Sequence, residues 1–338
     1  MPLRVGLTYN LKVDSPTGDR TDDWAAECEE IATVERIANA LVSLGHQVIY
    51  LPFNKQLVAR LQQDSPDIVF NIAEGWCGRN RESIIPAILE YLEIPYTGSD
   101  ALCLGICLDK AVCKCVVGAA GVPVSKSWVV HSEDELEDIQ SFPVFVKPNT
   151  EGSSKGIRGN SRVEDQNQLI ERVRWVTQIY QQPALIEPFL PGREFTIGVI
   201  GNNPPVSLPI MEVVPDDTLA STDFVYSYET KTANLERLIC PAALNHSEVQ
   251  QLTNIALAAH KAVGCLDVSR VDVRMDTAGH PYFLEINPLP GLADCSLLPM
   301  QAAAAGVNYN ELINAILTSA CRRYSSFNNE AAALSTTT

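Results

Sequence analysis

Residues 142–157 read FPVFVKPNTEGSSKGI, and they place a glycine- and serine-rich segment directly after an apolar run. The backbone N–H groups of such a segment can close around an anion, so a segment of this kind after a strand often binds phosphate. Its glycines and lysines have the spacing of neither G-x-x-x-x-G-K-[ST] nor G-x-G-x-x-G. Taken alone, the segment is therefore either a phosphate-binding loop or an ordinary turn.

The composition of the 338-residue chain is that of a globular protein with two or three domains. Its net charge of −16 argues against nucleic acid or an anionic membrane as a partner, since both select basic surfaces. No apolar run has the length of a membrane span, and MPLRVGLTYN predicts a first strand rather than a signal peptide. The sequence therefore predicts a cytoplasmic protein.

Four of the ten cysteines cluster in LCLGICLDKAVCKCVV, which has no histidine and no C-x-x-C spacing. They are Cys103, Cys107, Cys113 and Cys115. The apolar surroundings favour buried thiols that pack as small hydrophobic side chains over a metal site.

Strand and helix patterns alternate along the chain, and they predict an α/β fold of three α/β domains. Residues 1–100 predict a parallel sheet covered by helices, and residues 101–183 predict a central unit with the Gly-Ser segment. Residues 184–324 predict a third unit that opens with two strands, ALIEPF and REFTIGVIG, joined by a turn. Residues 325–338 have too little apolar pattern to pack and are predicted to be disordered.

The third unit contains a predicted hairpin, VDVRMDTAGHPYFLEINP, with a candidate metal site. Asp272 stands on its first strand, while Glu285 and Asn287 stand two residues apart on the second and share one face. Two carboxylates and an amide oxygen are hard ligands that suit Mg²⁺. The alternative is a solvated strand face, which the apolar character of both strands disfavours.

Two lysines add to this picture: Lys147 ends the apolar run before the Gly-Ser segment, and Lys110 follows another apolar run. Lysines and Mg²⁺ together neutralise the charge that develops when a γ-phosphoryl group is transferred. The combination of lysines, flexible loop and acidic hairpin therefore predicts an ATP site, which none of its parts does alone.

Over nearly its whole length the chain resembles the ATP-grasp superfamily, in the branch of D-alanine–D-alanine ligase-like enzymes. The stretches that carry the resemblance are IPYTGSD (residues 94–100), LDKAVCK (108–114), VKPNTEGSSKGI (146–157), LIEPFLPGREFTIGVIGN (185–202), RVDVRMDTAGHPYFLEINPLPGL (270–292) and SLLPMQAAAAG (296–306). The resemblance implies an ADP-forming carbon–nitrogen ligase that holds ATP between its central and C-terminal domains.

The resemblance also implies roles for residues at the nucleotide. Lys110 and Lys147 would contact the phosphates, and Lys231 would reach the γ-phosphate. Asp272, Glu285 and Asn287 would hold two Mg²⁺ ions. The other expected nucleotide contacts are Glu151, Gly152, Ser153 and Ser154 in the loop, Glu187 and Leu190 at the adenine, and Glu194 at the ribose.

Further implied roles concern the chemical step and the substrates. Arg270 and the backbone at Gly291 would stabilise oxyanion charge, with Ser153 and Lys231 as further catalytic residues. Ser296 would contact the acceptor carboxylate. Residues 215–235, with Tyr226 and Tyr228 as substrate contacts, would form a lid that excludes water.

The first substrate pocket departs from the family pattern. The expected G-G-x-S-x-E-x-x-V-S element is replaced by a stretch in which Glu27, Glu29 or Glu30 would reach the first amino group, without a sign of which one. The segment GWCGRNRE places Arg79 and Arg81 where the family has a histidine and acids, so one of them is expected to bind an acceptor carboxylate. Thr232 replaces a tyrosine of the lid, which would enlarge the pocket.

These departures leave the residues expected at the nucleotide unchanged, but they change the substrate that we expect. The sequence predicts an ATP-dependent ligase of specialised metabolism, for example one that joins mycosporine-glycine to serine or threonine. Two alternatives remain open: a D-alanine–D-alanine ligase of cell-wall synthesis, and a nucleotide-binding protein without catalysis. The expected partners are a small acceptor and an amino acid, with a homodimer as a further expectation.

Overall fold

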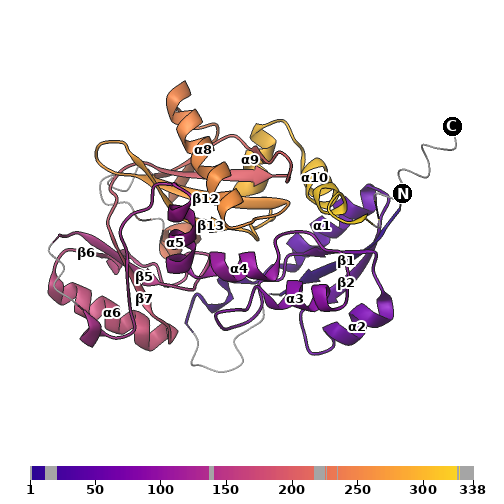
Figure 1. The fold of residues 1–338 in the computed structure, drawn as a ribbon, viewed down its shortest axis with the longest axis horizontal. Coiled ribbons are helices and arrows are strands. Elements are labelled where there is room, and N and C mark those ends of the chain that lie inside the picture. Colours follow the sequence, from indigo (N-terminus) through magenta and orange to yellow (C-terminus); the bar gives the residue numbers. More distant parts are fainter. Residues whose placement is uncertain are drawn as a thin grey trace.

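The computed structural model describes residues 2–11, 21–136, 141–216, 225, 227–233, 235–325 and 327. Three β-sheets organise this part of the chain. In Figure 1 the N-terminal sheet and a small sheet covered by α6 (Gln166–Tyr180) lie at opposite ends, with the largest sheet between and above them. No helix in the described ranges is long and apolar enough to cross a membrane.

The N-terminal sheet is parallel, as predicted, with the order β2-β1-β3. Its strands and the helices of this unit are β1 (Arg4–Tyr9), β2 (Gln47–Pro52), β3 (Ile68–Asn71), α1 (Ile31–Ser43), α2 (Leu57–Asp64) and α3 (Ile84–Tyr91). The last long helix, α10 (Tyr309–Cys321), also belongs to this core, because Leu312 and Ile316 are buried in one cluster with Val5 and Leu7. The two ends of the sequence thus build one hydrophobic core.

The small sheet is antiparallel and has the order β4-β7-β5-β6. Its strands are β4 (Trp128–Val130), β5 (Val144–Pro148), β6 (Arg162–Val163) and β7 (Ala184–Pro188). The predicted strand ALIEPF is therefore β7, an inner strand of this sheet, and it does not pair with the strand that follows it. Because Ile186 completes the core under α6, the central unit extends through β7 and the boundary at residue 183 is corrected.

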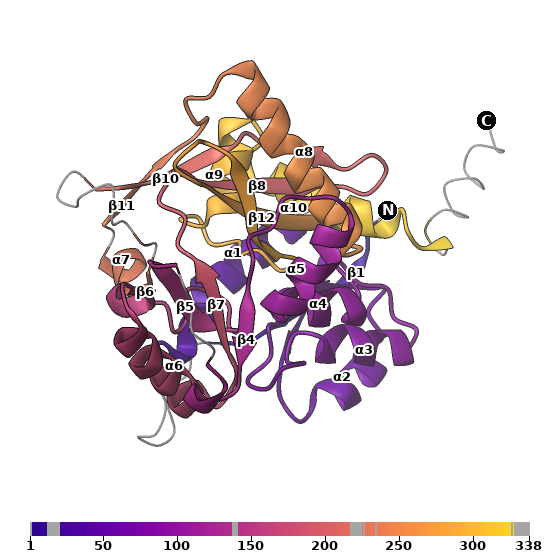
Figure 2. The same ribbon diagram turned by 60° about the vertical axis from the view of Figure 1, so that its left-hand side comes forward.

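The largest sheet has the order β11-β10-β8-β12-β13, with β9 paired to β8. Its strands are β8 (Glu194–Ile200), β9 (Val206–Ser207), β10 (Met211–Pro215), β11 (Glu236–Ile239), β12 (Val268–Met275) and β13 (Pro281–Asn287). Helix α8 (His246–Ala262) covers one face. In Figure 2 this sheet lies above both the small sheet and the N-terminal unit.

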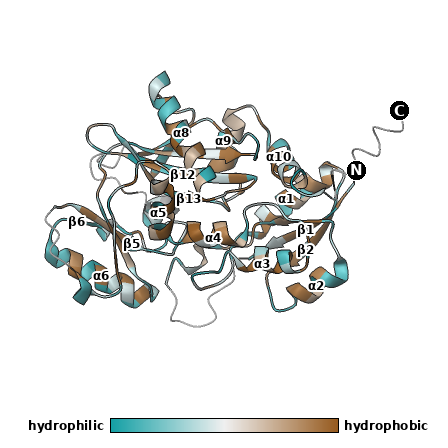
Figure 3. Cartoon of the chain, viewed as in Figure 1, coloured by the Kyte–Doolittle hydropathy of each residue, from teal (hydrophilic) through white to brown (hydrophobic). Residues whose placement is uncertain are grey.

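Two helices assigned to the central unit by sequence pack elsewhere. Helices α4 (Ala101–Leu108) and α5 (Lys110–Ala119) bury Cys103, Cys107 and Cys113 in the core of the largest sheet. The prediction of buried thiols is confirmed for these three cysteines, whereas Cys115 is exposed. Figure 3 colours the chain by hydropathy. Hydrophobic residues lie on the inner strands, and hydrophilic residues lie on the outer turns of α2, α6 and α8.

Candidate active site

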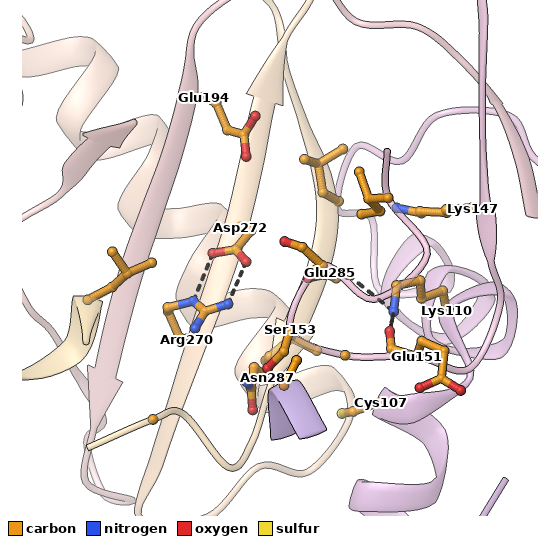
Figure 4. Close-up of a pocket in the computed structure, with 18 of the residues that line it drawn as sticks. Cys107, Lys110, Lys147, Glu151, Ser153, Glu194, Arg270, Asp272, Glu285 and Asn287 are labelled. Atoms are coloured by element: carbon orange, nitrogen blue, oxygen red, sulfur yellow. Dashed lines mark hydrogen bonds and ion pairs between the residues drawn. The ribbon is translucent and has the colours of Figure 1, made fainter. Parts of the chain in front are cut away.

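A cavity of about 390 Å³ lies where the three sheets meet, and residues from every unit line it. The small sheet contributes Lys147 and Glu187, and the largest sheet contributes Arg270, Asp272 and Glu285. The N-terminal unit contributes the acidic residues Glu27, Glu29, Glu74 and Glu82. Figure 4 shows the hairpin side chains facing the two lysines across this cavity.

The hairpin residues lie as the sequence predicted. Asp272 on β12 is the direct cross-strand partner of Glu285 on β13, and Asn287 follows two residues later on the same strand. The Arg270 guanidinium binds Asp272 with two hydrogen bonds, from Nε at 3.1 Å and from Nη2 at 2.9 Å. Oxygen ligands thus line one wall of the cavity, and this donor set fits Mg²⁺.

Two neighbouring lysines keep the Glu285 carboxylate ionised. The Lys110 ammonium lies 3.4 Å from the Glu285 carboxylate and also donates to the backbone oxygen of Glu151. Burial alone would raise the pKa of Glu285, but Lys110, Lys147 and Arg270 outweigh that effect and lower the pKa to about 2. The carboxylate is therefore ionised at neutral pH, the form that a divalent cation requires.

Lys147 occupies the opposite wall. Burial lowers the pKa of this lysine to about 8, although Glu285 opposes the shift. Its ammonium lies 3.0 Å from Glu187, and Lys114 binds the other oxygen of the same carboxylate. Glu187 lines the cavity, but an adenine amino group would have to compete with both ion pairs for its carboxylate.

An apolar region of the cavity suits a base and a sugar. Its side chains are Phe145, Phe189, Leu190, Leu238, Leu284 and Ile286. Glu194 lies beside this region and accepts a hydrogen bond from Arg274 at 2.9 Å. Burial raises the pKa of Glu194 in spite of that arginine. The residues expected at adenine and ribose, Glu187, Leu190 and Glu194, thus all line this cavity.

The Gly-Ser loop is held by two acidic residues of the N-terminal unit. The Gly152 N–H donates to Glu27 at 2.8 Å, and the Gly156 N–H donates to Asp23 at 2.9 Å. Gly156 has a φ of +71°, and a Cβ atom there would lie 2.3 Å from the Pro148 side chain. The loop therefore needs glycine at 156, and its amide donors face carboxylates in this structure.

Arg81 compensates the charge of Glu27. It is 3% exposed, binds Glu27 at 2.5 Å and donates to the backbone oxygen of Thr150. Burial alone would raise the pKa of Glu27, but Arg81 and Lys155 hold it below its usual value. Arg79 is exposed and pairs with Asp109.

Because of these ion pairs, the structure does not support the predicted contact of Arg79 or Arg81 with an acceptor carboxylate. Neither Arg79 nor Arg81 lines the cavity, and the guanidinium of each is bound to a carboxylate of the protein. The physical reason is that a buried glutamate needs a cation, and the fold brings Arg81, and also Lys155, to Glu27. The sequence pattern alone gave no sign of this pairing, since 54 residues separate the partners.

The lid is described only in part. Helix α7 (Tyr228–Ala233) lies against the loop: the Tyr228 N–H donates to the oxygen of Ile157, and Arg158 pairs with Glu229 at 3.1 Å. Thr232 donates to the backbone of its own helix and does not line the cavity. Tyr226 and the side chain of Lys231 lie outside the described residues.

Most of the remaining predicted residues line the cavity, but Tyr228 and Glu30 do not. Ser153 and Ser154 lie in the loop with positive φ angles, and Gly291 and Ser296 lie near each other at the start of α9 (Leu297–Ala304).

The sequence did not single out Asp23, Glu74, Glu82 or Lys155. For Glu74 a signal was present, because an acidic residue just past a buried parallel strand lies at the edge where such sheets bind ligands.

Replacing Asp23 with asparagine is expected to loosen the loop. Asp23 accepts hydrogen bonds from the Gly156 N–H and from the Tyr180 hydroxyl, and an amide accepts them more weakly than a carboxylate. Since a hydrogen bond to a charged group contributes about 1.5–3 kcal/mol, amide exchange at Gly156 should accelerate by about 10- to 100-fold. Hydrogen-exchange mass spectrometry of residues 150–157 measures this. Glu35→Gln, at an exposed position of α1 away from the loop, is the control, and equal exchange in both variants would contradict the expectation.

Comparisons with known proteins agree with this geometry. Residues 119–318 match the family model described as D-ala D-ala ligase C-terminus. A D-alanine–D-alanine ligase of Pelotomaculum thermopropionicum is 30% identical over 319 residues, which cover 91% of this chain and 96% of that protein. An uncharacterized protein of Sinorhizobium fredii is 34% identical over 300 residues, 86% of this chain and 88% of that protein.

Solved structures show the same fold. The D-alanine–D-alanine ligase of Bacillus anthracis, complexed with ATP, superposes with a TM-score of 0.72 at 23% identity over 95% of this chain and 98% of that one. The VanG D-Ala:D-Ser ligase of Enterococcus faecalis gives a TM-score of 0.72 at 18% identity, over 95% and 100% of the two chains.

The fold and the family match define an ATP-grasp enzyme, and residues of all three sheets line its cavity. Among ATP-grasp enzymes the chain belongs to the D-alanine–D-alanine ligase family. It is an ATP-dependent, ADP-forming carbon–nitrogen ligase that joins two small substrates.

Proposed function

We propose that the protein joins two small amino acids into a dipeptide, with D-alanine as the first substrate to test. The observation that carries the proposal is the division of one cavity into a cationic part, with Lys110, Lys147 and Arg270, and an acidic part from the N-terminal unit. An amino acid has the matching charges, because its carboxylate suits the cations and its ammonium suits the acids. The names of the relatives support the same reading.

The specialised ligase that the sequence favoured loses its support. Its main argument was an arginine free to bind an acidic acceptor, and both candidate arginines are paired with carboxylates of the protein. Its second argument was a pocket enlarged at Thr232, which does not line the cavity. The D-alanine–D-alanine alternative is therefore the better supported of the two. The homodimer and the cytoplasmic location stay predictions.

The chemistry follows from the arrangement of the residues. A carboxylate oxygen of the first amino acid attacks the γ-phosphorus of ATP, the bond to the bridging oxygen breaks, and ADP leaves. The amine of the second amino acid then attacks the acyl carbon, loses a proton, and expels phosphate. Lys110 and Lys147 hold the phosphates, while Arg270 and the Gly291 N–H stabilise the oxyanion of the second step.

Asp272, Glu285 and Asn287 would hold Mg²⁺, which neutralises phosphate charge when it is bound. The lid protects the acyl phosphate from water, since that intermediate hydrolyses readily. Arg158 is placed to fix the closed lid, because it pairs with Glu229 of α7 and with Asp22 of the N-terminal unit. The acyl phosphate thus forms in a cavity that three units close together.

Phosphate release with Mg-ATP and single amino acids tests the proposal. D-Alanine alone should support turnover and yield a product with the mass of alanylalanine, whereas L-alanine should give little. A mixture without D-alanine, containing serine, threonine and larger carboxylate-bearing acceptors, tests the specialised reading. Turnover only in that mixture would overturn the dipeptide proposal, and phosphate release that no substrate stimulates would contradict ligase activity of this kind.

A further inference from the structure

Three thiols from distant parts of the sequence meet beside the cavity. The Sγ atoms of Cys103, Cys107 and Cys265 all lie within 4.8 Å of one another. Cys103 Sγ lies 3.9 Å from Cys107 Sγ and 3.6 Å from Cys265 Sγ. No disulfide joins them, since all three cysteines are free. The sequence pattern grouped Cys103 and Cys107 with their neighbours in the chain and gave no sign of Cys265.

Two rigid segments hold the three sulfur atoms in place. Cys103 and Cys107 are four residues apart on α4, so their side chains lie on the same side of that helix. The Asp100 carboxylate accepts a hydrogen bond from the Cys103 N–H at 2.8 Å and caps the helix there. Cys265 lies in the turn between α8 and β12, where its N–H donates to the His260 oxygen at 2.9 Å. The sulfur atoms thus come from fixed backbone, as a metal site of defined geometry requires.

The spacing of the sulfur atoms matches that of thiolates around one metal ion. A Zn–S bond is about 2.3 Å long, so two sulfur ligands of a tetrahedral ion lie about 3.8 Å apart. The separations of 3.9 Å and 3.6 Å from Cys103 fall on either side of that value. Sulfur ligands select thiophilic ions such as Zn²⁺ over Mg²⁺, which prefers oxygen. The cluster therefore differs in kind from the carboxylates of the hairpin, which suit Mg²⁺.

Cys107 connects the cluster to the cavity. It is 5% exposed and lines the cavity, whereas Cys103 and Cys265 do not line it and are buried in the core of the largest sheet. Figure 4 shows the Cys107 sulfur below Lys110, among the side chains of the cavity. An ion that enters the cavity therefore meets this thiol first. Three protein ligands leave the fourth position of a tetrahedral ion to a water molecule from the cavity.

We propose that Cys103, Cys107 and Cys265 bind one thiophilic divalent ion, with Zn²⁺ as the ion to test, through three thiolates and one water molecule. Each thiol gives its proton to solvent when it ligates the ion, so binding tightens as the pH rises. The bound ion joins α4 to the turn before β12. The inference goes beyond the proposed function and does not depend on it, because the site needs neither ATP nor an amino acid.

Absorption spectroscopy with Co²⁺ in place of Zn²⁺ tests the site. Co²⁺ shows a sulfur-to-metal charge-transfer band only when thiolates ligate it, so an ion held by the oxygen atoms of the hairpin gives no such band. The full-length protein is reduced, freed of metal with a chelator and titrated with Co²⁺ in the presence of excess Mg²⁺. We expect one equivalent of Co²⁺ to give the band. Added Zn²⁺ should abolish it, because Zn²⁺ binds such ligands more tightly than Co²⁺ does.

The variants Cys103→Ser and Cys265→Ser each remove one ligand, and Cys321→Ser, at a half-buried cysteine of α10, is the control. Each cluster variant should bind Co²⁺ more weakly by over about 100-fold, since even the loss of a residue that only orients a ligand costs about 10- to 100-fold. The control should bind Co²⁺ as wild type does. A wild-type protein without the band, or a band that both cluster variants keep, would overturn the inference and would show that the three thiols only pack against one another.

Thermal unfolding separates the loss of a ligand from a folding defect. One equivalent of Zn²⁺ should raise the melting temperature of the reduced wild-type protein, because an ion that binds only the folded state stabilises it. A cluster variant that unfolds at a lower temperature should still show no rise with Zn²⁺. A rise of the same size in wild type and in both cluster variants would assign the ion to other ligands and would overturn the inference.

Discussion

Glu285→Gln is expected to lower the turnover of the ligase by about 10²- to 10³-fold, the effect of removing one electrostatic contact to a reacting centre. The Glu285 carboxylate lies 3.4 Å from Lys110 and directly across the strand pair from Asp272. Glutamine keeps the shape but loses the charge. It would weaken a bound Mg²⁺ and would leave the charge of Lys110 uncompensated beside the phosphates.

Steady-state phosphate release over a range of Mg²⁺ concentrations checks this expectation. The variant should need more Mg²⁺ than wild type and should still turn over more slowly at saturation. Its melting temperature is measured beside that of Glu35→Gln, so that a folding defect is recognised. Near-normal turnover in a folded Glu285→Gln protein would show that the acidic residues of the hairpin form a solvated strand face and not a metal site.

Arg270→Lys is expected to lower kcat by about 10²- to 10³-fold as well, while the KM for ATP changes little. The Arg270 guanidinium holds Asp272 through two nitrogens in the cavity, and Figure 4 shows this contact below Glu194. A lysine ammonium is a single point charge and cannot keep the two-pronged contact. The oxyanion of the second step would then lose an oriented donor, although the net charge of the site is unchanged.

The measurement is kcat and KM for ATP and for the amino acid, with Arg60→Lys on α2 as a control far from the cavity. A selective fall in kcat supports a role in the chemical step. A rise in the KM for ATP with unchanged kcat would assign Arg270 to nucleotide binding and would contradict the expectation.

Much of the candidate nucleotide site could be predicted from the sequence, because its signals are local. The hairpin with Asp272, Glu285 and Asn287 shows its register in a period-two pattern, and Lys147 ends a recognisable strand. The Gly-Ser loop follows that strand directly. Each of these features depends on residues that are neighbours in the chain or in one hairpin.

The substrate pocket depends on pairings that no local pattern encodes. Arg81 looks like an exposed arginine at a helix start until Glu27 is brought to it by the fold. Strand β7 has the same apolar pattern whether it pairs with β5 or with β8, and only the completed sheet decides. For the same reason Glu82 looks like a surface acid in the sequence, while the structure buries it against the cavity.

Helix α10 packs its buried side chains, Leu312 and Ile316 among them, against the core around β1. Strand β1 therefore gains this covering helix only after all the residues between β1 and α10 have been synthesised. At about 5–20 residues per second, this interval is on the order of 15 to 60 seconds. During that time Val5 and Leu7 lack part of the core that surrounds them in the finished protein. A nascent or prematurely terminated chain thus exposes an apolar sheet face of the kind that chaperones bind, so the yield of this enzyme in a cell depends on the last helix being translated.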